Sequence, residues 1–144
     1  MFKVMTAHIK LAKLAFACLV AANISVHAQS GKNITETDTL FYGTWKGTSI
    51  CQIKGSPCHD ESVVYHIGKS GKENLIEIKA NKIVNGAEEG MGTIEFRYDP
   101  ATKEIVSVSQ PDAIWKLKKT NNSMSGTLMY KGELYRKIQL SKQN

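Results

Sequence analysis

Few residues of this 144-residue sequence could carry chemistry, and the densest group is Cys58-His59-Asp60-Glu61. Imidazole and carboxylate groups are common metal ligands, so His59, Asp60 and Glu61 could bind a metal ion or an acid-sensitive partner. Consecutive side chains on a strand point to opposite faces, so three neighbours converge on one ion only in a loop. We therefore interpret the cluster as a solvated turn before a strand, and we predict no metal site and no cofactor.

Cys51 and Cys58 form the second candidate site, with six residues between them. This spacing matches neither a Cys-x-x-Cys redox motif nor a zinc knuckle. In an oxidising compartment, an even pair in a small domain indicates a disulfide. We expect a Cys51–Cys58 disulfide that pins a hairpin end, with a redox pair or a thiolate metal site as the alternative.

Nucleophilic catalysis has little support in the residue types. Ser49, Ser107 and Ser125 have no evident histidine and acid partners in the sequence. Only His59 and His66 remain once a leader peptide is removed, and no paired-carboxylate signature is present. We therefore do not expect an enzyme.

The N-terminus has the order of a secretory signal peptide. Three lysines and no acid precede the apolar run Leu14–Ile24, and small residues end at Ala28. We expect a signal peptide over residues 1–28 with cleavage after Ala28, because the run is shorter than the roughly 20 residues that span a bilayer. A retained N-terminal anchor is the alternative. Cys18 raises a lipoprotein alternative, but bulky Phe16 fits the lipidation triplet poorly.

Export also changes the charge of the chain. The formal net charge of +6 falls to +3 in the mature chain, because three lysines leave with the leader. This modest net charge does not indicate a surface that binds nucleic acid. We expect an exported protein, periplasmic or extracellular, with no transmembrane segment in the mature chain.

The mature chain alternates strand signals with turn signals after a polar lead over residues 29–40. Ile94, Phe96 and Tyr98, for example, alternate with polar residues, which is typical of a sheet with one wet face. Short connections force antiparallel neighbours, and closure removes exposed edges. We therefore predict an all-β, eight-stranded antiparallel up-and-down β-barrel over residues 41–144, with a two-sheet sandwich as the alternative. The expected strands are Gly43–Ile53, Ser62–Gly68, Leu75–Val84, Met91–Tyr98, Glu104–Ser109, Ile114–Lys119, Met124–Tyr130 and Leu134–Ser141.

Gly43-Thr44-Trp45 at the start of the first strand resembles the Gly-x-Trp signature of the lipocalin and fatty-acid-binding (calycin) barrels. The resemblance implies that Trp45 plugs one end of the barrel and that Arg136, from the last strand, packs across it. Stacking on an indole would compensate a buried guanidinium. Several small periplasmic inhibitors of lysozymes or proteases look like equally short eight-stranded barrels.

Two functions follow as expectations. The first is a lipocalin-like module for a small apolar ligand, bound by Trp45, Tyr65, Phe96, Trp115 and Tyr130; the alternative is that these aromatic residues are structural core. The second is a protein-binding module, such as an inhibitor of an envelope hydrolase, that uses the loops Gln52–Glu61, Asn85–Gly90 and Asn121–Ser123. A structural envelope protein without a ligand is a third possible function.

The lysines of Lys116–Lys119 are expected on an exposed face, as gatekeeping charges or as a contact for an acidic partner.

Overall fold

The computed structural model describes residues 39–144, where eight strands follow one another up and down in a closed antiparallel barrel. The predicted signal peptide, and the polar lead up to residue 38, lie outside the described residues. The closed sheet confirms the predicted fold class and excludes the sandwich. The strands are β1 (Gly43–Cys51), β2 (Glu61–Lys69), β3 (Ile76–Val84), β4 (Ala87–Asp99), β5 (Glu104–Ser107), β6 (Ala113–Thr120), β7 (Ser123–Tyr130) and β8 (Glu133–Lys142).

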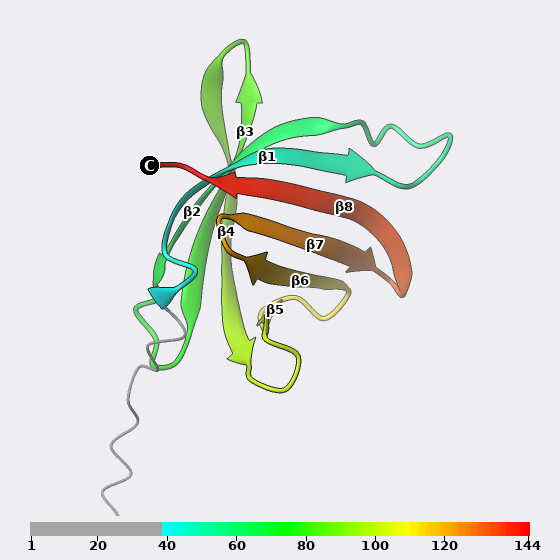
Figure 1. Ribbon diagram of the computed structural model, residues 1–144. Helices are drawn as coiled ribbons and strands as arrows, with labels where there is room; N and C mark the ends of the chain where they lie inside the picture. Colours follow the sequence, from blue (N-terminus) through cyan, green and yellow to red (C-terminus); the bar gives the residue numbers. More distant parts are fainter. Residues whose placement is uncertain (1–38) are drawn as a thin grey trace, which may run out of the picture. The chain divides into compact units, whose positions relative to one another are not determined.

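The barrel closes at β1, which lies between β2 and β8 (Figure 1). Trp45 is the register partner of Tyr65 on β2 and of Lys142 on β8. The backbones of β1 and β8 come very close at Gly47, where an added Cβ would collide with the carbonyl group of Gln139. A glycine at this point lets the sheet coil tightly enough to close.

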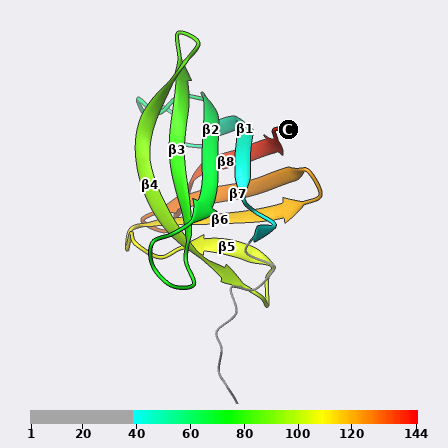
Figure 2. The ribbon, with the colours of Figure 1, turned by 90° about the vertical axis from the view of Figure 1, so that its left-hand side faces the viewer.

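The β3–β4 hairpin differs most from the predicted boundaries. The turn was expected to continue to Gly90, but β4 begins at Ala87. Asn85 and Gly86 form the turn alone, with φ values of 52° and 82°. Two successive residues with positive φ match the twist of the flanking strands, so pairing continues up to the turn. The hairpin therefore extends as a long arm beyond its neighbours (Figure 2).

The inward side chains of all eight strands fill the barrel interior. Alternation sends every second residue inward over most of the sheet, as the sequence predicts, but residues 87–93 of β4 are all exposed. The core cluster contains Phe41, Trp45, Val63, Tyr65, Ile67, Ile76, Ile78, Ala80, Ile94, Phe96, Ile105, Leu117, Met124, Ile138 and Leu140.

Candidate functional site

Three of the five residues predicted to bind a small ligand pack into the barrel core. Trp45 has 0% of its surface exposed, and Tyr65 and Phe96 have 1% each. A side chain beside an internal space large enough for a water molecule would show exposed surface there. The interior around these three residues is therefore packed with protein atoms.

The other two predicted ligand residues lie toward the end of the barrel where β6 begins and β7 ends. Trp115 is half-buried, and its ring meets the Tyr65 ring edge-on, with centroids 6.3 Å apart. Tyr130 is 44% exposed, and its ring lies 5.8 Å from the ring of Tyr135. The five aromatic residues thus do not surround one common cavity.

The expected contact between Trp45 and Arg136 is not formed. The Nζ of Lys142 lies 5.6 Å from the centroid of the Trp45 ring, in the place expected for the guanidinium. The indole Nε1 donates a hydrogen bond of 2.8 Å to the Phe41 carbonyl. Arg136 is the register partner of Cys51, at the far end of β1. Closure of the sheet sets this register, which a motif at each end of the chain does not reveal.

Arg136 instead forms a buried polar cluster inside the other end of the barrel. Its Nη1 donates hydrogen bonds of 3.2 Å to the carbonyl and to the Oγ of Ser49, and lies 3.1 Å from Oε2 of Glu61. Arg136 is only 9% exposed, so the Glu61 carboxylate supplies the charge compensation that the sequence assigned to an indole. The inward position of Arg136 was predicted, whereas its partner was not.

The hydroxyl group of Tyr65 faces this cluster without a hydrogen-bond partner among the described residues. Burial raises the pKa of Tyr65 above its ordinary value of 10.0; the Arg136 charge opposes this shift and the Glu61 charge adds to it. The phenol therefore stays protonated and neutral beside the ion pair.

The segment from Cys51 to Glu61 confirms the predicted disulfide, because Cys51 and Cys58 are bonded. His59 and Asp60 are exposed, as predicted for a solvated turn, but the prediction is wrong for Glu61, which is the first residue of β2 and has a side chain only 16% exposed. Asp60 accepts a hydrogen bond of 2.9 Å from the Cys51 backbone N–H, and Glu61 turns inward. Among residues 39–144, no three His, Cys, Asp or Glu side chains are arranged to hold a metal ion.

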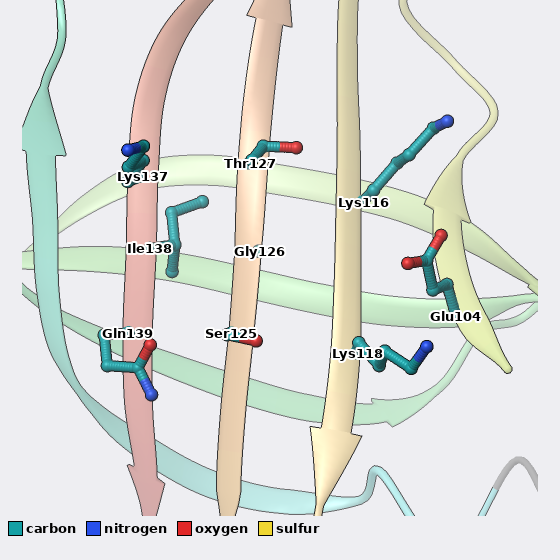
Figure 3. Close-up of a pocket in the computed structure, with 9 residues that line it drawn as sticks. All are labelled: Glu104, Lys116, Lys118, Ser125, Gly126, Thr127, Lys137, Ile138 and Gln139. Atoms are coloured by element: carbon teal, nitrogen blue, oxygen red, sulfur yellow. The ribbon is translucent and has the colours of Figure 1, made fainter. Parts of the chain in front are cut away.

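The outer face of β6, β7 and β8 carries a hollow of about 370 Å³, here called the lysine groove (Figure 3). Lys116 and Lys118 from β6 line one side, Lys137 from β8 lines the other, and Ser125 and Thr127 of β7 lie between them. The sequence placed the β6 lysines on an exposed face, but Lys137 joins them only through the pairing of β6, β7 and β8. The pattern Ser-x-Thr between two lysine-bearing strands was the signal that could have indicated a groove.

A smaller hollow of about 170 Å³ lies at the end of the barrel that contains Trp45. Its lining combines apolar and cationic side chains: Leu40, Phe41, Tyr98, Lys103 and Lys119. Leu40 is 54% exposed and Phe41 is buried, so this hollow opens at the surface and reaches a residue of the core cluster.

No known protein family matches the sequence, and no curated protein is similar to it. The closed eight-stranded antiparallel barrel is compatible with a lipocalin-like architecture. In the part of the chain that the structure describes, no helix has the length and apolar composition to cross a membrane.

Proposed function

We propose that this domain is an exported protein-binding module that contacts its partner with the outside of the barrel. The observation that carries the proposal is the packed interior, where Trp45 and Phe96 have 0% and 1% of their surface exposed. A small apolar ligand would need space between these side chains and Trp115. Without such space, the outer surface and the loops are left for recognition.

Aromatic and apolar side chains at one end of the barrel support a protein partner. Tyr130 and Ile114 are 44% and 41% exposed, and they lie on the paired strands β7 and β6. Tyr130 contacts Tyr135, whose ring in turn lies 5.7 Å from the Arg136 guanidinium carbon. Exposed tyrosines held in place by neighbours are typical of the residues that contribute most to protein interfaces.

Two of the three loops expected to bind a protein lie at this same end. Strands run alternately up and down, so the β1–β2 loop and the β3–β4 turn share an end with the β7–β8 turn. The Asn121-Asn122 turn between β6 and β7 lies at the opposite end. The Cys51–Cys58 disulfide limits the conformations of the β1–β2 loop, which lowers the entropy cost of binding.

Family and compartment are parts of the same proposal. The calycin resemblance is supported at Trp45, which is buried and hydrogen-bonded to Phe41, but not at Arg136. Export is supported by the Cys51–Cys58 disulfide, because such bonds persist in oxidising compartments. The proposal includes no catalytic role.

Site-specific photo-crosslinking in the cell that produces the protein tests this proposal. A photoreactive phenylalanine analogue in place of Tyr130 is expected to yield a discrete crosslinked protein adduct. The matched control has the same analogue in place of Lys79, which is exposed on the β3 wall, and it is expected to yield no adduct. If Tyr130 yields no adduct and native mass spectrometry of the purified protein reveals a bound apolar molecule, the lumen-ligand function replaces this proposal.

A further inference from the structure

The lysine groove has a regular construction that follows from strand register. Leu117 and Ile138 point inward, with 0% and 2% of their surface exposed, so their neighbours on the same strands point outward. The outward side chains of β7 are short, whereas those of β6 and β8 are long, and this difference hollows the surface. Two rows of register partners cross the groove: Lys116–Thr127–Lys137 and Lys118–Ser125–Gln139.

The protein offsets the positive charge of the groove only in part, because three lysines line it against one carboxylate, Glu104, the register partner of Lys118. Within residues 39–144, none of these three lysines forms an ion pair. On the side of the barrel formed by β2, β3 and β4, lysines do have carboxylate partners: Lys72–Glu95 at 2.7 Å, Lys79–Glu77 at 3.8 Å and Lys82–Glu89 at 3.6 Å. The wall over β6–β8 therefore presents a local excess of positive charge.

Protection of a sheet edge does not explain these lysines. Lysines on an edge strand prevent pairing with another chain. Strand β6 pairs with β5 and β7, and the barrel is closed, so β6 is not an edge. The gatekeeping role expected from the sequence thus does not apply to Lys116 and Lys118, and the alternative of an acidic partner gains weight.

The groove chemistry favours phosphate over other anions. Lysine ammonium groups act as point charges toward phosphate, whereas planar carboxylates are best matched by the bidentate fork of arginine, which the groove lacks. The hydroxyl groups of Ser125 and Thr127 add donors on the floor. No aromatic side chain lines the groove, so it has no platform for stacking nucleobases. A peptide could not pair with the groove segments of β6, β7 and β8, because each of them already has a partner strand on both sides.

The spacing of the charges indicates a ligand with repeated phosphates. Lys116 and Lys118 are two residues apart on one strand, which separates their Cα atoms by about 7 Å. Lys116 and Lys137 lie on either side of β7, so their Cα atoms are separated by about 9.5 Å. Convergence of all three lysines on one small anion would restrict three long side chains and bring their charges together, whereas a chain along β7 can place a separate phosphate at each ammonium group.

We propose that the lysine groove binds a linear phosphate polymer, which lies along β7 with its phosphates between the lysines of β6 and those of β8. This site is independent of the tyrosine-bearing end of the barrel. Loss of either activity therefore leaves the other proposal standing.

Titration of the purified protein with inorganic polyphosphate, followed by calorimetry at low and at physiological salt, tests the site. Binding should weaken as salt rises, because ion pairs in an open groove are screened. Two variants separate the groove from net charge. The double variant Lys116→Gln/Lys137→Gln should weaken binding about tenfold or more, whereas Lys72→Gln/Lys79→Gln, with the same charge change on the other wall, should leave it within about twofold.

A third variant, Thr127→Phe, fills the groove floor without changing the charge and should also weaken binding severalfold. Circular dichroism and thermal unfolding check that each variant is folded. Equal weakening in both lysine pairs, or full binding by Thr127→Phe, would show that polyphosphate senses only net charge and would overturn the proposal. Equally tight binding of poly-L-glutamate would overturn the assignment to phosphate.

Discussion

Glu61 on β2 and Arg136 on β8 form an ion pair, with Oε2 and Nη1 3.1 Å apart, although β1 lies between their strands. The same Nη1 donates hydrogen bonds to the carbonyl and Oγ of Ser49 on β1. The two ionic side chains are only 11% and 16% exposed, for Arg136 and Glu61 respectively. This cluster therefore links three adjacent strands at the point where the barrel closes.

Removing one charge of this pair should destabilise the fold strongly. Glu61→Gln leaves the buried Arg136 charge without a counter-charge, which typically costs about 3 kcal/mol or more. Urea unfolding of the wild type and the variant measures the loss. The control is Glu73→Gln at an exposed residue, which should change the unfolding free energy little. The double variant Glu61→Gln/Arg136→Met should recover part of the loss; a single variant no less stable than the control would contradict a structural role for the pair.

Tyr65 should ionise later than the other tyrosines on alkaline titration. Burial raises its pKa above the ordinary value of 10.0, so the folded state keeps a proton that the unfolded state releases. The linked stability is present below that ordinary value and is lost as the pH rises above it. Ultraviolet difference spectroscopy should show one of the five tyrosines titrating only when the barrel unfolds. In Tyr65→Phe this late component should disappear; if it persists, another tyrosine is the shielded one.

Acid should destabilise the barrel through three surface carboxylates. Hydrogen bonds from His66, and then from Asn81, lower the pKa of Glu88, and hydrogen bonds likewise lower those of Glu95 and Asp99. In the unfolded state these carboxylates have their ordinary pKa values, 4.5 for Glu88 and Glu95 and 3.8 for Asp99. As the pH falls through these values, the unfolded state takes up protons before the folded state does, so the folded state loses stability. Urea midpoints measured from neutral pH to below this range should fall less for Glu88→Gln/Glu95→Gln/Asp99→Asn than for the wild type. An equal fall of the urea midpoint in the wild type and the variant would show that other groups cause the acid sensitivity.

The disulfide should stabilise the fold without being required for it. Cys51 and Cys58 enclose six residues, and closing so short a loop contributes about 2–3 kcal/mol in the chain-entropy model. Cys51→Ser/Cys58→Ser should lower the unfolding free energy by that amount while circular dichroism remains that of a β-barrel. A reductant should have the same effect on the wild type and none on the variant. Loss of all structure in the variant would show that the bond is essential.

The strands were predictable because their signal is local. Alternation along β4 identified Ile94 and Phe96 as core residues, and both are buried. The start of β4 was misplaced because Gly90 looked like part of a turn, whereas in the barrel it pairs with Asn81. A strand tolerates a glycine when the neighbouring strand is already held in place, and that condition depends on residues far away in the chain.

The amino-acid sequence alone determined the number of strands, their inward faces and the Cys51–Cys58 bond, because each of these depends on residues close together in the chain. Only the tertiary structure decided that Lys142, not Arg136, lies over Trp45, and that Lys137 faces Lys116 across β7. Both arrangements depend on the register at which β8 pairs with β1 and with β7. That register is set by all the ladders of the barrel together, so no single segment of the chain contains it.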